Sequence, residues 1–193
     1  MSPKFWEYYL SIEADLAACS RFVEFTEANY ATYSTEFARI IVAAAAEIDA
    51  ILSELCGVLD PRAKAGTINQ YHPIICTQFP VFTQCGVEVR RSHLFLEPWR
   101  GWEKGQSPNW WGQGYNKIKH DRTNHFQEAN LLNALQAVGA LFLTILHFHH
   151  HGTNRPMSVD MNRGAQLFTP AKAEGDKSGT YWFYGVPQPR IAD

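Results

Sequence analysis

The strongest constraint on the fold is a stripe of apolar residues that runs from Thr35 to Cys56 at the spacing of an α-helix. Its members recur every three or four residues, which places them on one face of about six helical turns. A face of this length must be covered by other apolar surface, so it predicts a helical core. Gly57 predicts the end of this helix, and Asp60-Pro61 its exit. The stripe comprises Phe37, Ile41, Ala44, Ile48, Ile51, Leu52 and Leu55.

A second long helix is predicted from His125 to about His150. Asn124 and Gln127 have the spacing of a capping box at its start. The apolar run Ala137–Leu146 within it is about half as long as a membrane span, so we expect a core helix and no membrane insertion. The residues predicted to be buried are Leu131, Leu132, Leu135, Val138, Leu141, Phe142, Ile145 and Leu146.

Weaker patterns predict two further helices. One covers Lys4–Phe25 and is expected to break near Ser20, where the apolar spacing fails. The other is a short helix over Thr67–Ile75, expected to be interrupted by Pro73.

Alternating apolar and polar residues between Val81 and Leu96 predict two short strands. A further strand is expected at Tyr181–Tyr184. The predicted fold is therefore mainly α: a four- to five-helix bundle over residues 1–151 with a small β insert near 81–96. Residues 152–193 are predicted to form a loop-rich tail packed on the bundle.

Composition limits the classes of function. Of 193 residues, 46% are hydrophobic and 19% charged, which is typical of one globular domain. The net charge of −2 provides no global basic surface, so any contact with RNA would use a local patch. The four cysteines have no CxxC spacing and the N-terminus has no signal-peptide pattern, which predicts a cytoplasmic protein with reduced thiols. Phosphate-loop, dinucleotide-binding and hydrolase motifs are absent from the sequence.

The segment from Trp110 to Arg122 is the richest in chemistry. Ser107-Pro108 predicts a helix start just before it. On a helix, Asn116, Lys119 and His120 share one face, at positions i, i+3 and i+4. A second face, expected to be buried, would carry Trp111, Tyr115 and Ile118.

This segment, on a helical scaffold, resembles the motif of the HEPN superfamily of small helical bundles. The family motif is an arginine, usually a polar residue such as asparagine, and a histidine four to six residues after the arginine. Asn116 and His120 match the asparagine and the histidine, Tyr115 stands at the arginine position, and Arg122 follows the histidine. The resemblance covers about residues 5–150. It implies an RNA-processing or RNA-binding protein in a stress or defence system.

The resemblance also implies a mechanism, that of a metal-independent endoribonuclease without a cofactor. His120 would act as general base or acid, Arg122 would stabilise phosphoryl charge, and Asn116 would hold the imidazole or a phosphate oxygen. Lys117 and Lys119 would bind backbone phosphates. A homodimer is implied, with two motifs facing one cleft.

Other interpretations of these residues remain open. Trp110 and Trp111 either stack on RNA bases or belong to the core. The lysines also fit an ordinary solvated face, and His120 a helix C-terminus. The substitution by Tyr115 favours an alternative function, a non-catalytic module that binds a protein partner.

A histidine run, His147 to His151, offers a weaker alternative function in metal binding. His147 and His151 are at i and i+4, the spacing with which two imidazoles share a metal on a helix. A frayed, solvated helix end is the preferred interpretation of this run, and we expect no metal site.

Overall fold

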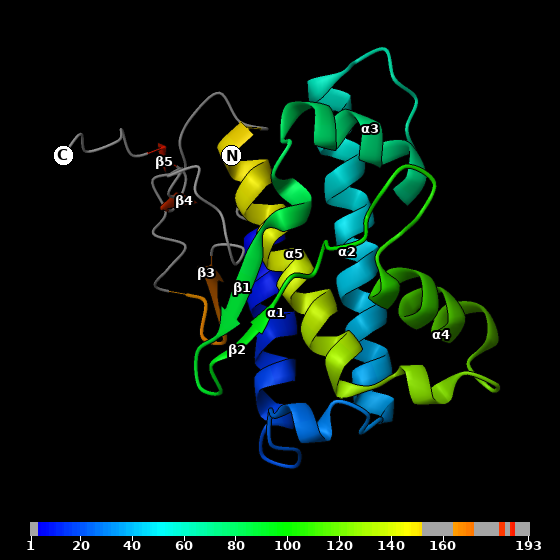
Figure 1. Ribbon diagram of the computed structural model, residues 1–193, viewed down its shortest axis with the longest axis vertical. Coiled ribbons are helices and arrows are strands. Elements are labelled where there is room, and N and C mark those ends of the chain that lie inside the picture. Colours follow the sequence, from blue (N-terminus) through cyan, green and yellow to red (C-terminus); the bar gives the residue numbers. More distant parts are fainter. Residues whose placement is uncertain (1–3, 152–163, 172–181, 184–185, 188–193) are drawn as a thin grey trace.

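The computed structural model describes residues 4–151, 164–171, 182–183 and 186–187. The described fold is mainly α with a small antiparallel sheet, which confirms the predicted fold class (Figure 1). The helices are α1 (Lys4–Cys19), α2 (Thr35–Leu59), α3 (Ile68–Gln78), α4 (Asn116–Asp121) and α5 (Leu131–His151). The strands are β1 (Gly86–Val89), β2 (Leu94–Leu96), β3 (Phe168–Ala171), β4 (Trp182–Phe183) and β5 (Val186–Pro187).

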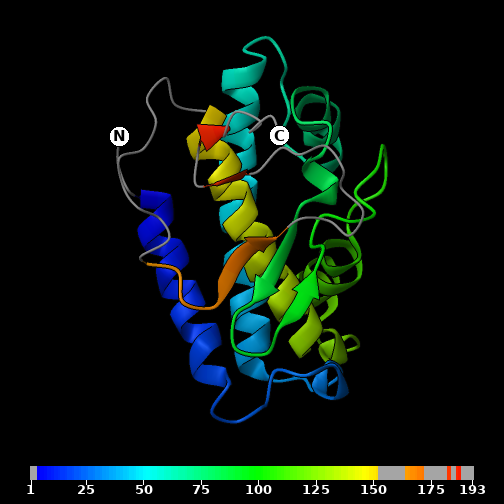
Figure 2. The ribbon, with the colours of Figure 1, turned by 60° about the vertical axis from the view of Figure 1, so that its left-hand side comes forward.

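Three long helices, α1, α2 and α5, pack against one another pairwise and form the centre of the bundle. The predicted stripe of α2 is buried along its whole length. It faces α5, whose predicted core positions are also buried, apart from the half-buried Leu132 and Leu146. Figure 2 shows the three helices running side by side, with the sheet laid over them.

Helix α5 is long and apolar enough to cross a membrane by length and composition alone. The stretch that meets this criterion is Leu131–His149, with a mean hydropathy of 1.7. Within the protein, 83% of that stretch is buried. The helix therefore serves as the central core element of the bundle, as its sequence predicted.

Two predicted helix boundaries are wrong, and one predicted break does not occur. Helix α2 continues through Gly57 to Leu59, and it ends where Pro61 favours an extended Asp60. Helix α5 begins at Leu131, because the side chain of Asn130 accepts the N–H of Asn133 at 2.9 Å. Helix α3 passes through Pro73 and keeps a buried face against α2. The helix predicted over Lys4–Phe25 stops at Cys19, next to the expected break at Ser20, and does not resume before Phe25.

The predicted strands near 81–96 form the hairpin of β1 and β2, and β3 from the C-terminal region completes a sheet of order β2-β1-β3. The pairing of β3 with β1 was not predicted. Of the strand expected at Tyr181–Tyr184, residues 182–183 form β4, while Tyr181 and Tyr184 lie outside the described residues.

A buried carboxylate joins α1 to the segment that leads into β3. Glu13 is 2% exposed, and its two oxygens accept the backbone N–H groups of Gln166 at 2.8 Å, Leu167 at 2.9 Å and Phe168 at 3.3 Å. The hydroxyl of Tyr9 donates a fourth hydrogen bond at 2.7 Å. Burial and the neighbouring carboxylate raise the pKa of Tyr9 well above its ordinary value, so the phenol stays a donor.

We expect the substitution Glu13→Gln to lower the free energy of unfolding by about 2 kcal/mol, because an amide NH2 would replace an acceptor oxygen among backbone donors. Urea unfolding measures this loss. The control is Glu7→Gln on the exposed side of the same helix, where we expect a change within about 0.5 kcal/mol. Equal losses in the two variants would contradict the anchoring role of Glu13.

Candidate functional site

The segment singled out in the sequence forms one continuous helical stretch at the edge of the bundle. Residues Trp110–Tyr115, labelled η3, form a π-helix, and α4 follows without a break. The N–H of Asn116 bonds the carbonyl of Trp111, five residues earlier. We call η3 and α4 together the motif helix. Such wide turns are uncommon and often occur at functional sites.

The buried face of the motif helix is the predicted one. Trp111, Tyr115 and Ile118 are buried, and the rings of Trp111 and Tyr115 meet edge to face with centroids 5.0 Å apart. This face packs on α2 and α5. The exposed residues of the motif helix are therefore carried by a rigid support.

The tryptophans predicted to stack on bases belong to the core. Trp110 is 2% exposed and Trp111 5% exposed, and the indole N–H of Trp110 donates to the carbonyl of Pro98 at 2.7 Å. With both rings covered, neither offers a free face to a base. The alternative interpretation, in which they pack in the core, describes their position.

Gly114 allows the motif helix to approach α5 closely. A Cβ at this position would lie 3.1 Å from the side-chain amide of Asn133. That amide is itself fixed, because its Nδ2 donates to the carbonyl of Glu128 at 2.8 Å. A larger side chain at residue 114 would push the helix outward and displace the residues that follow it.

On the outer side of the motif helix, Asn116 and His120 are adjacent, one turn apart. Asn116 is half-buried and His120 is exposed. Among the residues that the structure describes, none forms a hydrogen bond or ion pair with either side chain. The structure thus brings together the amide and the imidazole of the predicted site and leaves both free to meet a ligand.

Arg122 is not brought to the same place. It is exposed, and its backbone continues the helix with φ −57° and ψ −34°. Two residues along a helix correspond to a rotation of about 200°, so the Cβ of Arg122 points away from the side that carries His120. The expectation that Arg122 returns a guanidinium to the imidazole is not supported by this geometry.

The two lysines have different roles in the structure. The ammonium of Lys119 donates to the hydroxyl of Tyr115 at 3.1 Å and lies 5.2 Å from the centroid of that ring. This hydrogen bond, with the charge of Asp49 as a weaker cause, raises the pKa of Lys119. Lys117 is half-buried and forms no ion pair with another described residue.

The position where the family motif has its arginine is filled by a core residue. Tyr115 is buried against Trp111 and its hydroxyl is engaged by Lys119. A phenol in this position presents no cation to a phosphate. The cations of the motif helix are therefore Lys117, Lys119 and Arg122.

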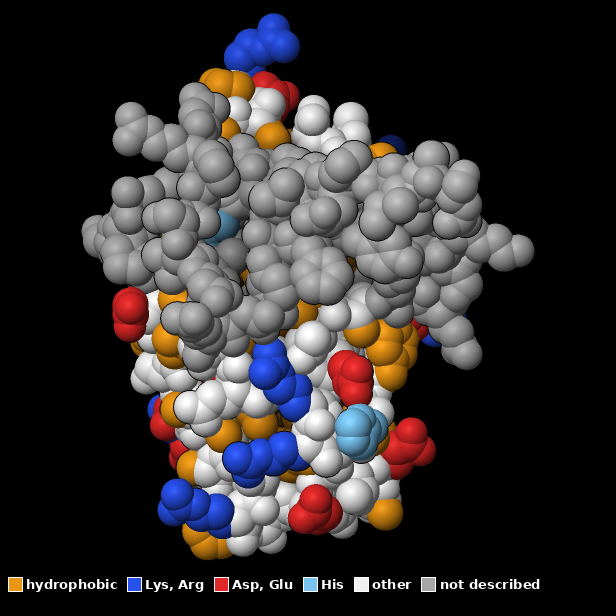
Figure 3. Space-filling view, turned by 90° about the vertical axis from the view of Figure 1, so that its left-hand side faces the viewer, with side chains coloured by type: hydrophobic (Ala, Val, Ile, Leu, Met, Phe, Trp, Pro, Cys, Tyr) orange, Lys and Arg blue, Asp and Glu red, His pale blue; other side chains and the backbone are white. Residues whose placement is uncertain are grey.

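The carboxylate nearest in sequence is engaged elsewhere. Asp121 accepts the side-chain amide of Asn124 at 2.8 Å and lies 3.6 Å from Nε2 of His125. On the opposite side of the molecule, cationic and anionic side chains are interspersed over the described surface (Figure 3). The end of the motif helix carries Lys117, Lys119, His120 and Arg122, with Asp121 among them.

The histidine run is not a solvated helix end, and that prediction is wrong for the residues whose side chains are described. His147 and His149 are 4% and 3% exposed. Nδ1 of His147 donates to the carbonyl of Leu143 at 2.8 Å, and its ring meets those of Phe79 and Phe82. Over the described part of the chain, no three His, Cys, Asp or Glu side chains gather as metal ligands.

Two further features of the site region escaped sequence reasoning. Asp49 of α2 accepts the hydroxyl of Tyr71 from α3 at 3.2 Å. Burial and this carboxylate raise the pKa of Tyr71 to about 12. A pocket of about 400 Å³, lined by both polar and apolar side chains, lies beside the start of the motif helix, with Asn109 and Gln136 in its wall. Neither carries a local sequence signal.

Comparisons with known proteins assign no family to this chain: no family model, no curated protein and no solved structure matches it.

We expect the two faces of the motif helix to respond differently to truncation. Trp111→Ala removes a buried ring and should cost about 3–5 kcal/mol of unfolding free energy. His120→Ala removes an exposed side chain and should change it by less than about 0.5 kcal/mol. Urea unfolding of both variants tests this, and a large loss for His120→Ala would show that the imidazole is structural.

We also expect a pH dependence of stability from His149. Burial lowers its pKa below the ordinary value of about 6.5, so as the pH falls the unfolded chain takes up the proton first. The contribution to stability is complete above about pH 6.5 and decreases as the pH falls. Urea unfolding across this range should therefore show a shallower pH profile for His149→Leu than for the wild type. Parallel pH profiles of the wild type and His149→Leu would contradict the assignment of this pH dependence to His149.

Proposed function

We propose that this protein is a HEPN-like RNA-processing protein that binds the RNA backbone at the exposed end of the motif helix and cleaves it without a metal. The observation that carries the proposal is the pair Asn116 and His120. The two side chains are adjacent, reach solvent, have no hydrogen-bond or ion-pair partner among the described residues and stand on a helix with a buried face.

The chemistry requires one proton acceptor near a ribose. The imidazole of His120 takes the proton of a 2′-hydroxyl, whose oxygen then attacks the adjacent phosphorus. The bond from phosphorus to the 5′-oxygen breaks, the leaving oxygen takes a proton from water, and the imidazolium of His120 returns its proton to the solvent. The products are a 2′,3′-cyclic phosphate and a 5′-hydroxyl. Asn116 donates to a phosphate oxygen, and Lys117 and Arg122 bind neighbouring phosphates.

The assay is incubation of the untagged protein with mixed RNA in EDTA. We expect the wild type to produce cyclic phosphate ends and His120→Ala to produce none while keeping wild-type stability. The matched control is His93→Asn, which removes another exposed histidine from the turn between β1 and β2. Asparagine suits its positive φ of 54°. Undiminished cleavage by His120→Ala would refute the assignment.

Binding to the RNA backbone has its own signature in the salt dependence of affinity. For a single strand, the steepness of log K against log salt concentration falls by about 0.7 for each phosphate that the protein no longer neutralises. We expect this change for Lys117→Gln in fluorescence anisotropy with a labelled RNA. The control is Lys104→Gln, in the exposed turn before the motif helix. An unchanged slope for Lys117→Gln would remove this lysine from the RNA interface.

A second candidate function is supported by the burial of Tyr115. A chain that holds a core tyrosine where the family has its arginine fits a bundle that kept the scaffold and lost the chemistry. In that case the polar side of the motif helix contacts a protein partner. RNA that is neither bound nor cleaved by the wild type would favour this function over the first.

A further inference from the structure

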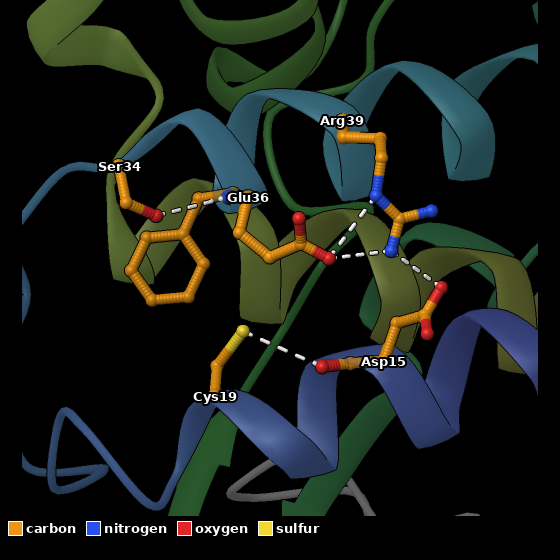
Figure 4. Close-up of polar contacts among 6 residues, drawn as sticks. Asp15, Cys19, Ser34, Glu36 and Arg39 are labelled. Carbon is orange, nitrogen blue, oxygen red and sulfur yellow. Dashed lines mark hydrogen bonds and ion pairs between the residues drawn. The ribbon is translucent and has the colours of Figure 1, made fainter.

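A second surface, remote in sequence from the motif helix, is built around an apolar pocket of about 370 Å³. The pocket lies between the end of α1 and the start of α2. Its apolar lining comes from Ala18, Cys19, Phe22, Val23 and Phe37, and its rim carries Asp15, Ser34 and Glu36. Figure 4 shows the polar part of this rim. For comparison, a dry cavity of about 150 Å³ accommodates benzene.

The thiol inside this pocket behaves as an apolar group. Cys19 is 8% exposed, and its Sγ donates to the backbone carbonyl of Asp15 at 3.4 Å. Burial raises the pKa of the thiol, so it stays neutral. The pocket therefore selects an uncharged, apolar group.

The rim of the pocket carries both signs of charge. The guanidinium of Arg39 bonds Asp15 at 2.6 Å and also bonds Glu36 (Figure 4). These three side chains remain about half exposed. The rim therefore combines one cation with two carboxylates.

Phe22 stands at the edge of this pocket with its ring in solvent. It is 88% exposed, and no other large hydrophobic residue in the described part of the chain is as exposed. Its position is fixed by the N–H, which bonds the carbonyl of Cys19 at 2.9 Å in the turn that ends α1. A phenyl ring held in water beside a pocket large enough for one is an unsatisfied apolar surface.

We propose that this surface is the interface of a twofold homodimer in which Phe22 of each copy enters the pocket of the other. In a twofold interface one patch must complement itself, so it needs a projecting group and a recess together. Phe22 and the pocket supply both. At the rim, Arg39 of one copy can face Asp15 or Glu36 of the other.

This dimer differs from the one that the HEPN resemblance implies. The HEPN resemblance implies a dimer around the motif helices, whereas no residue of the motif helix lines this pocket. It also stands independently of the proposed function, because a failure to cleave RNA says nothing about association. The two proposals are tested by different measurements.

Sedimentation equilibrium of the full chain over a range of concentrations tests the dimer. We expect the wild type to dimerise and Phe22→Glu to raise the dissociation constant at least tenfold. Ala18→Trp fills the pocket from within and should weaken the dimer similarly. The matched control is Tyr8→Glu, an exposed aromatic position of α1 outside the pocket, which should leave the constant within twofold.

Three results would overturn the proposal. A wild type that stays monomeric at the highest concentration reached would leave the pocket to another occupant. A dimer that Phe22→Glu does not weaken would place the interface elsewhere. Equal weakening by Tyr8→Glu would indicate a general effect of added charge. Circular dichroism of each variant confirms that it is folded before the comparison is made.

Discussion

The packing of α2 against α5 is the constraint on which the other elements depend. Both helices bury long apolar faces, and together they present the surfaces on which α1, the sheet and the motif helix lie. The entry to α5 is fixed by backbone hydrogen bonds from Leu131 to Thr32 and from Ser34 to Ala129, which tie the starts of the two helices together. The motif helix is thus packed on two of the helices that form the centre of the core.

In the candidate site, different residues anchor the motif helix and face the solvent. The motif helix places its aromatic residues inward, where they pack, and its amide and imidazole outward, where no described side chain engages them. A site of this kind has one strong feature, a well-supported pair of groups, and one weakness, the missing guanidinium beside the imidazole. The proposed RNA chemistry depends on the first, and the non-catalytic alternative on the second.

Local periodicity predicted the α2 stripe, the β1–β2 hairpin and the buried side of the motif helix, because each is set by residues close in sequence. What it missed was decided at long range. Asn124 and Asn130 are equally good caps by local chemistry, and contacts with Thr32 and Ser34 place the start of α5 at the second. The burial of His147 depends on the rings of Phe79 and Phe82, which lie far earlier in the chain. The pairing of β3 with β1 also joins segments that are far apart in sequence. Of the candidate site, the adjacency of Asn116 and His120 was predictable from helical spacing, and the orientation of Arg122 follows from the helical backbone that the structure shows at residue 122.

The central claim is that the exposed end of the motif helix is where RNA binds. The most direct test is a titration of isotope-labelled protein with a single-stranded RNA oligonucleotide, followed by NMR of the amide and imidazole signals. We expect the largest shifts on residues 116–122, with the imidazole of His120 among them. Shifts confined to the pocket between α1 and α2, or no shifts at all, would contradict it.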